Sequence, residues 1–212
     1  MKKLFVIILT ATVTGLFAQG RDQKATEILD AVIEKTNSYE NFMAEFNYVM
    51  INEAAGINES KEGSIIVSGD KYRLDIARQV VISNGENIWT ILADDGEVMI
   101  NALEEGDESV TPSNLLDKYN EKYKSKYKGE IDYNGRTAQL IELKPEEGKT
   151  YSKIEVLIDK EKDQILSFTI YDKNQSSYSY EIIKFKPDVE VSESTFCFVE
   201  ENYPGIDVID MR

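Results

Sequence analysis

The chain has 212 residues, a formal net charge of -15 and 30% charged side chains, which is enough length for one ordinary domain with a sizeable core. This acidity disfavours binding to nucleic acid and to anionic lipid head groups, so we expect no nucleic-acid partner. The chain contains no histidine, which excludes Ser-His-Asp and Cys-His catalysis, and it has no glycine-rich phosphate loop, so no cofactor or metal is expected.

The N-terminal residues have the features of an export signal. Lys2 and Lys3 precede an apolar run that ends at Ala18, and polar residues begin at Gln19. The run of about 14 apolar or small residues is shorter than the roughly 20 that a membrane anchor needs. We therefore predict a cleavable signal peptide over residues 1–18, a periplasmic location, and a single domain over residues 19–212. Removal of the two lysines changes the formal charge of the chain from -15 to -17.

The sequence contains one cysteine, Cys197, so an intramolecular disulfide is impossible even in an oxidising compartment. Its neighbours Phe196 and Phe198 favour a small buried apolar residue over a nucleophile.

The stretch from Asp22 to Ser38 is predicted to form one amphipathic helix, because apolar residues recur at helical spacing along one side. A strand is predicted over Asn41 to Ile51, and the polar stretch from Asn52 to Lys61 is predicted to be a hairpin loop. Alternate residues of the strand lie on one side: Phe42, Ala44, Phe46, Tyr48 and Met50.

Two further strands are predicted at Ser64 to Val67 and at Lys71 to Ile76, joined by a turn at residues 69–70. In the second strand apolar residues alternate with Arg73 and Asp75, which is typical of a strand with one wet face.

The Asn-Gly pair at residues 84–85 predicts a hairpin, because a type I′ turn needs positive φ at both central residues. A two-residue loop places Val80 opposite Trp89 and Val81 opposite Ile88. Both faces of this ribbon are then partly apolar, so sheet, helix or ligand must cover the face that carries Trp89. A strand from Glu97 to Leu103 is expected after the next turn.

The segment from Glu104 to Lys128 interrupts the strands, and Thr111 can cap a helix that has Pro112 in its first position. An apolar stripe follows at helical spacing: Leu115, Leu116, Tyr119, Tyr123 and Tyr127. Such a stripe more often packs against protein than binds a ligand, and its position beside a sheet suggests a lid.

Strands resume after Gly129, and turn sequences separate them from there to the C-terminus. Two short strands are predicted last, over residues 196–199 and 206–209. Because no crossover helix intervenes, the ten or eleven strands form an antiparallel meander. The predicted fold class is α+β, mainly β, with a single antiparallel sheet that must curl.

Several local patterns follow one another in a characteristic order. They are the opening helix with the aromatic stretch at residues 38–46, the strand pair from Gly63, the strand–Asn-Gly–Trp unit at 81–89, the hairpin at 172–180, and the ending from Phe196 to Ile209. Together with the export signal and the strand count, these patterns resemble the LolA-type periplasmic lipoprotein carriers over the whole mature length.

The resemblance implies an unclosed half β-barrel whose concave apolar face is covered by helices. This cavity is expected to shelter acyl chains of lipoproteins during transfer from the inner to the outer membrane, without enzymatic activity. The implied partners are acylated lipoproteins, an inner-membrane lipoprotein-releasing transporter as donor and, if one exists, an outer-membrane acceptor, and the chain is expected to be a monomer. The predicted lipid-binding residues are Phe46, Tyr48, Met50, Tyr72, Leu74, Trp89, Ile91, Met99, Leu115, Leu116, Tyr119, Phe168 and Ile170.

The sequence departs from the family pattern in one place. The family commonly has an Arg-Pro pair after the strand that here ends at Val67, and that arginine is thought to hold the lid. This chain has Ser-Gly-Asp at residues 68–70, whereas Arg73 matches an arginine that many relatives carry on the next strand.

Two alternatives stay open. One is a LolA-like shell that binds another lipid or acts as an envelope lipoprotein sensor. The other is an acidic-pair hydrolase, which needs two carboxylates within about 5 to 10 Å of each other inside the cavity.

Overall fold

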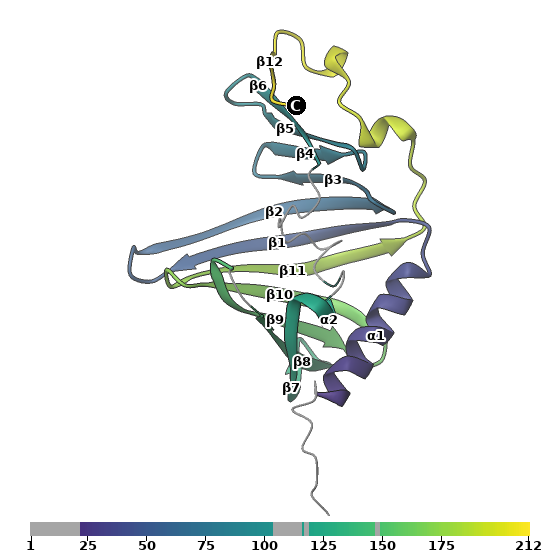
Figure 1. Cartoon of the computed structure of the whole chain (residues 1–212), viewed down its shortest axis with the longest axis vertical. Helices are drawn as coiled ribbons and strands as arrows, with labels where there is room; N and C mark the ends of the chain where they lie inside the picture. The colour runs from purple at the N-terminus through teal and green to yellow at the C-terminus, as the bar shows by residue number, and fades with distance from the viewer. Residues whose placement is uncertain (1–21, 104–115, 117–118, 147–148) are drawn as a thin grey trace, which may run out of the picture.

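A single sheet of twelve strands organises the computed structural model, which describes residues 22–103, 116, 119–146 and 149–212. The spatial order is β12-β6-β5-β4-β3-β2-β1-β11-β10-β9-β8-β7. The chain therefore enters at the centre with β1, moves by hairpins to β6, and returns from the opposite edge through β7 to β11 (Figure 1). The predicted fold class is confirmed, since the sheet is curled and unclosed. Only β12 departs from the antiparallel pattern, because it pairs in parallel with β6.

The strands of the first half are β1 (Phe42–Asn52), β2 (Ile57–Ser68), β3 (Lys71–Ile76), β4 (Gln79–Ser83), β5 (Asn87–Leu92) and β6 (Glu97–Ala102). Those of the second half are β7 (Tyr123–Tyr133), β8 (Arg136–Pro145), β9 (Tyr151–Asp159), β10 (Gln164–Asp172), β11 (Ser176–Pro187) and β12 (Asp207–Asp210). The helices are α1 (Gln23–Asn37), α2 (Tyr119–Lys122) and the 3-10 turns η1 (Glu193–Phe196) and η2 (Glu200–Asn202).

Helix α1 has the predicted position. The Asp22 side chain caps its first turn by accepting a hydrogen bond from the Ala25 backbone N–H at 3.2 Å. The apolar side of the helix is buried and packs against β7 and β10: Ala25, Ile28, Leu29 and Val32.

Four local predictions were wrong in whole or in part. The hairpin loop predicted over residues 52–61 forms but is shorter, because residues 57–61 belong to β2 and pair with β1, and backbone pairing does not require apolar side chains. The predicted helix does not extend past Lys122, since Tyr123 and Tyr127 lie in β7. Residues 196–199 do not form a strand, and Cys197 is exposed rather than buried.

The hairpin at residues 84–85 forms, but its register differs from the prediction. The loop has four residues, and Ile82 lies opposite Trp89. The Asn84 side chain fixes this loop, because its Oδ1 accepts hydrogen bonds from the backbone N–H groups of Glu86 at 2.9 Å and Asn87 at 2.8 Å. The register shift is two residues, so Val80 and Trp89 still share a face.

The signal peptide over residues 1–18 and the start of the predicted lid helix, including Leu115, lie outside the described residues.

Candidate functional site

The sheet has one face on which α1 lies, called here the inner face. The buried side of α1 forms a cluster with Ile141, Ile154 and Phe168. Phe168 of β10 is the cross-strand partner of Tyr180 of β11, and Tyr180 is the partner of Tyr48 of β1. All three side chains therefore lie on the inner face. The same alternation continues through β2 to Tyr72 and Leu74 in β3. Residues from both halves of the chain therefore line one continuous apolar surface.

The inner side of β1 is buried as far as Phe46 and half-buried beyond it. Phe42, Ala44 and Phe46 are 8%, 2% and 0% exposed, whereas Tyr48 and Met50 are half-buried. Figure 1 shows α1 beside the β7–β10 end of the sheet, while the β1–β2 hairpin extends well beyond it. We call the inner-face surface formed by β10, β11, β1, β2 and β3 the trough.

Aromatic rings form the floor of the trough. Tyr180 stacks on Phe168 with centroids 4.6 Å apart, and its ring also lies 5.2 Å from Tyr48 and 5.6 Å from Phe46. Gly63 lies opposite Phe46 in β2, and a Cβ there would approach the Phe46 ring to 2.6 Å. The glycine therefore leaves room for the ring to lie flat against the neighbouring strand.

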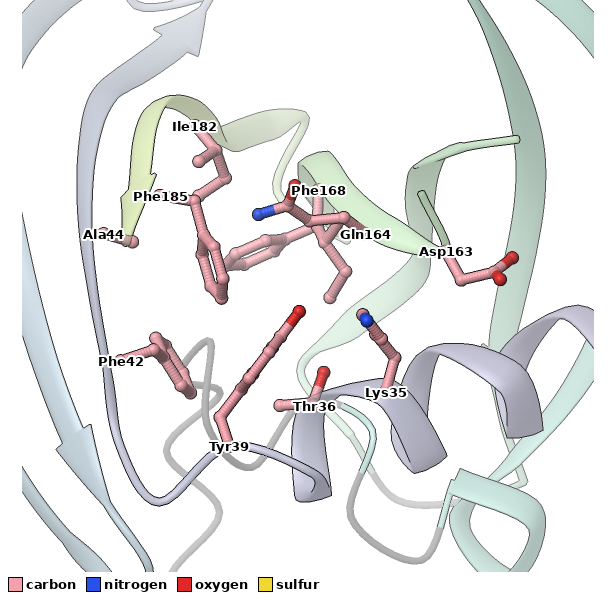
Figure 2. A pocket seen from close by; sticks show the side chains of 11 residues that line it. Lys35, Thr36, Tyr39, Phe42, Ala44, Asp163, Gln164, Phe168, Ile182 and Phe185 are labelled. Carbon is pink, nitrogen blue, oxygen red and sulfur yellow. The ribbon is translucent and has the colours of Figure 1, made fainter. Parts of the chain in front are cut away.

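A hollow lies between the C-terminal half of α1 and the sheet, as Figure 2 shows. Its lining is mostly apolar: Lys35, Thr36, Tyr39, Phe42, Ala44, Asp163, Gln164, Ile165, Phe168, Ile182 and Phe185. The free volume is about 50 Å³. A buried water needs roughly 10–15 Å³ and a benzene-binding cavity has about 150 Å³, so the hollow holds a few small groups and the cover must move to admit a long chain.

Polar contacts hold α1 mainly through its N-terminal half. Asp22 Oδ2 accepts a hydrogen bond from the Tyr127 backbone N–H at 3.0 Å, and the Lys24 ammonium lies 3.8 Å from the centre of the Tyr127 ring. The Tyr119 hydroxyl donates to Asp30 Oδ1 at 2.8 Å. At the other end of the helix Tyr39 reaches the sheet through a ring contact with Phe185 at 5.8 Å.

The contact between α1 and β7 is imperfect in one respect. The hydroxyls of Thr26 and Ser125 are buried, and neither has a hydrogen-bond partner among the described residues.

Burial also raises the pKa of tyrosines in the trough. The pKa of Tyr180 is raised to about 12, first by burial and then by the neighbouring Tyr48 and Tyr178. Burial is also the main cause of the raised pKa of Tyr48. Both phenols therefore stay neutral at any physiological pH, as expected for a surface that excludes water.

The structure brings together most of the predicted lipid-binding residues. The inner face carries Phe46, Tyr48, Met50, Tyr72, Leu74, Met99, Phe168 and Ile170. Leu116 and Tyr119 belong to the same buried cluster as α1. Together with α1 they cover part of the inner face of the sheet.

Trp89 and Ile91 lie on the opposite, outer face, which corrects the prediction that they share a lining with Phe46. The register decides this, because Leu74 pairs with Val81 and Val81 pairs with Thr90, which places Thr90 on the inner face and its neighbours outside. The outer cluster consists of Ile82, Ile91 and Val98, with Val80, Trp89, Phe198, Tyr203 and Ile206 packed against it. The C-terminal segment therefore covers the Trp89 face.

The prediction missed several lining residues. Tyr178, Tyr180 and Ile182 alternate in sequence, and this signal could have placed them beside Met50 and Tyr48. Phe185 has the opposite parity, and it reaches the inner face because a β-bulge inserts Ile183 between the pairs on either side.

The hollow is poor in the groups that catalysis or metal binding needs. Asp163 is the only carboxylate among the described residues that line it. Within residues 22–103, 119–146 and 149–212, no three metal-ligating side chains gather in one place. Among those same residues, no helix has the length and apolar composition needed to cross a bilayer.

Comparisons with known proteins agree on the fold. The family model described as outer membrane lipoprotein carrier protein LolA matches residues 38–199. An uncharacterized conserved protein from Thermus thermophilus is 13% identical with a TM-score of 0.62, and the match covers 89% of this chain and 99% of that one. No curated protein matches the sequence significantly.

Two other solved structures align less well. A putative outer membrane lipoprotein-sorting protein domain from Vibrio parahaemolyticus is 13% identical with a TM-score of 0.48, covering 82% of this chain and 96% of that one. A LolA superfamily protein from Nitrosomonas europaea is 9% identical with a TM-score of 0.45, covering 82% and 97%.

Proposed function

The chain belongs to the LolA family of outer membrane lipoprotein carrier proteins, and from this premise we propose that it is a non-enzymatic periplasmic carrier that shelters lipoprotein acyl chains in the trough. The observation that carries the proposal is an apolar surface built from two halves of the chain and covered by a helix that leaves a hollow beneath it. The predicted donor, acceptor and monomeric state belong to the same proposal.

The hydrophobic effect explains why such a carrier is needed. Each methylene group exposed to water costs roughly 0.8 kcal/mol, so an acyl chain of about 15 such groups costs about 12 kcal/mol to expose. Half-buried aromatic and flexible side chains such as Tyr48, Met50 and Ile170 can repack around chains of different shape.

Helix α1 is the part of the cover that must move. Its N-terminal half is tied to β7 by Asp22 and Lys24, whereas its C-terminal half borders the hollow. We infer that the C-terminal half swings outward and that the acyl chain then replaces its apolar contacts with the sheet.

This chain lacks the family arginine after Val67, and other groups are placed to hold the cover. Arg73 does not serve, because it lies on the outer face in a bidentate ion pair with Asp75. The hydrogen bond from Tyr119 to Asp30 joins the two covering segments instead. Loss of this bond in Tyr119→Phe is expected to populate the open state and to tighten the apparent binding of an acyl probe.

The experiment that tests the function measures binding of a fluorescent acyl probe and of an acylated lipoprotein to the delipidated mature chain. Two neighbouring residues of β10 offer a matched pair of variants, since Ile170 faces the trough and Thr169 faces outward, and both are half-buried. Ile170→Gln is expected to weaken binding and Thr169→Gln to leave it unchanged.

Failure of the delipidated chain to bind any acyl probe or lipoprotein would refute the carrier function. Recovery of a signalling protein without lipoprotein in a pull-down would favour the sensor alternative instead.

A further inference from the structure

Basic residues are concentrated in one part of this acidic chain. Residues 119–153 contain eight basic and six acidic side chains, whereas residues 22–103 contain six and fifteen, and residues 154–212 contain six and thirteen. Residues 119–153 supply β7, β8 and the start of β9, the last three strands at one edge of the sheet. The fold therefore gathers positive charge at one edge of a negatively charged protein.

Three lysines of this edge lie on the outer face of the sheet. Tyr123 and Tyr127 of β7 pack in the cluster with α1 on the inner face. Lys124 and Lys126 alternate with these tyrosines along the strand, so they face outward. Lys144 of β8 is directly opposite Lys124 and shares the outer face.

Two further lysines complete the group. Glu155 of β9 lies opposite the outward-facing Thr169, so Lys153, two residues before Glu155, also faces outward. Lys128 Nζ lies 3.8 Å from Glu142 Oε2 on the same face. We call these five side chains the lysine patch: Lys124, Lys126, Lys128, Lys144 and Lys153.

The carboxylates within the lysine patch are less exposed than several of its ammonium groups. Glu142 forms ion pairs at 3.7–3.8 Å with two of the lysines, yet its side chain is only 10% exposed. Glu155 lies 2.6 Å from Lys153 Nζ and its side chain is 24% exposed. The side chains of Lys124 and Lys144, by contrast, are 74% and 61% exposed. The outermost layer of the patch is therefore cationic.

The lysine patch also has more positive than negative groups. Besides Glu142 and Glu155, Glu146 pairs with Lys124 at 3.2 Å, which gives three carboxylates to five lysines. Lys126 is exposed and forms no ion pair with any residue that the structure describes. The excess charge is available to an anionic partner.

The chemistry of the lysine patch restricts that partner. A lysine is a point charge and lacks the planar fork with which arginine recognises a single carboxylate or phosphate group. The five ammonium groups are spread over three strands, about 14 Å along β7 and about 10 Å across the strands. Such a broad array suits a surface that carries many anionic groups, and clusters of about four to eight basic residues are typical of binding to anionic membranes.

The net charge of the whole chain does not prevent such binding. Exposed charges further apart than the Debye length, about 10 Å at 0.1 M salt, are largely screened from one another. Strand β2, where the more acidic first half of the sheet begins, is four strand spacings from β9, roughly 19 Å away. The field close to the lysine patch is therefore set by the patch itself.

We propose that the lysine patch docks the protein on an anionic phospholipid bilayer, with the outer face of β7, β8 and β9 toward the lipid head groups. The hollow lies on the inner face near the opposite strand ends, where Gln164 begins β10, so docking leaves the C-terminal half of α1 free to move. This inference goes beyond the proposed function, because the lysine patch shares no residue with the trough.

The test measures sedimentation of the delipidated mature chain with two kinds of vesicle, phosphatidylcholine alone and phosphatidylcholine with about 30% phosphatidylglycerol. The patch variant Lys124→Gln, Lys126→Gln, Lys144→Gln removes three exposed charges. The control variant Lys71→Gln, Lys162→Gln, Lys186→Gln removes the same formal charge near the opposite ends of the strands. Urea denaturation of each variant detects any folding defect.

The wild-type chain is expected to bind the anionic vesicles and not the neutral ones, with an affinity that falls at least about tenfold between about 50 and 300 mM salt. The patch variant is expected to lose at least about tenfold in affinity for the anionic vesicles, and the control variant less than about twofold. Both variants should bind an acyl probe as the wild-type chain does, because the trough is unchanged.

Equal losses in the two variants would assign the effect to net charge and overturn the inference, as would a wild-type chain with no preference for anionic vesicles. An oligoglutamate peptide that binds the patch as tightly as the vesicles do would assign it to an acidic protein instead, which also overturns the inference. Vesicle binding without binding of any acyl probe would refute the carrier function alone.

Discussion

Alternation of apolar and polar residues along the strands gives the sheet two apolar regions, the outer cluster around Trp89 and the trough on the inner face. The two regions differ in how they are covered. On the outer face, Ile82, Ile91 and Val98 are covered by the C-terminal segment, whose Phe198 and Tyr203 rings stack at 5.5 Å. Backbone hydrogen bonds from Asp207 to Gly96 and from Met211 to Ile100, both 2.8 Å, fasten that segment to β6. The chain has thus filled this region with its own side chains.

The trough on the inner face is different. Its floor is as well buried, but Tyr48, Met50, Tyr178 and Tyr180 stay half-buried and its cover leaves a hollow. An apolar face of a strand must therefore be shielded from water. The face alone does not determine whether side chains of the same protein or a bound ligand shield it. The following changes test whether the two regions differ in this way.

Phe46→Ala should have the largest effect, because Phe46 is fully buried and supports the trough floor. We expect a loss of about 3–5 kcal/mol in the free energy of unfolding, measured by urea denaturation. Asn47→Ala, the outward-facing neighbour, is expected to change it by less than about 0.5 kcal/mol. Similar small losses for both variants would mean that the trough has no packed floor.

Phe198→Ala tests the outer region. Removing a half-buried aromatic cover should cost roughly 1–2 kcal/mol of stability. Trp89 is the only tryptophan, so its emission reports on this cluster, and we expect a shift to longer wavelength on exposure to water. Affinity for an acyl probe should be unchanged, and a marked loss would show that the two regions are not independent.

The pH dependence of the free energy of unfolding should distinguish the trough from the outer cluster, although the expected effect is smaller. The pKa of Tyr180 is about 12 in the folded chain against 10.0 for an unperturbed phenol, so the unfolded chain loses this proton first as pH rises. Stability is therefore fully present below pH 10 and decreases between pH 10 and 12. At pH 11 the loss is on the order of 1 kcal/mol.

Urea denaturation between pH 8 and 11 should show this decrease in the wild-type chain and a weaker one in Tyr180→Phe. An identical pH profile for the two proteins would place Tyr180 in water rather than in the trough.

The sequence predicted the sheet well because alternation and turn residues are local signals. The two Asn-Gly pairs show where prediction from local signals fails. At residues 134–135 both backbone φ angles are positive, 55° and 77°, as a two-residue turn requires. At residues 84–85 the Asn84 side chain binds the following backbone and lengthens the loop, a competition that the dipeptide alone does not reveal.

One spacing of apolar residues can also be compatible with both a helix and a strand. Tyr119, Tyr123 and Tyr127 recur every four residues, which places them on one side of a helix and equally on one side of a strand. The prediction chose the helix, and pairing with β8 made residues from Tyr123 onward a strand. Nonlocal pairing, absent from the local pattern, decided the outcome.

The candidate site was harder to predict than the fold. Alternation gives each strand two faces but does not say which faces of distant strands coincide, so Trp89 and Ile91 were assigned to the wrong side. The bulge at Ile183 likewise reversed the parity of Phe185. Both facts depend on the cross-strand register, which is set by the whole sheet.

The most direct test of the central claim is the position of a bound acyl chain relative to the two faces. A lipid brominated in the middle of its chain quenches tryptophan emission at short range, and Trp89 is a natural reporter for the outer face. The double variant Trp89→Phe, Ile170→Trp places the reporter in the trough. We predict strong quenching of the tryptophan at 170 and little quenching of Trp89 in the wild-type chain, whereas strong quenching of Trp89 and none at 170 would contradict the account.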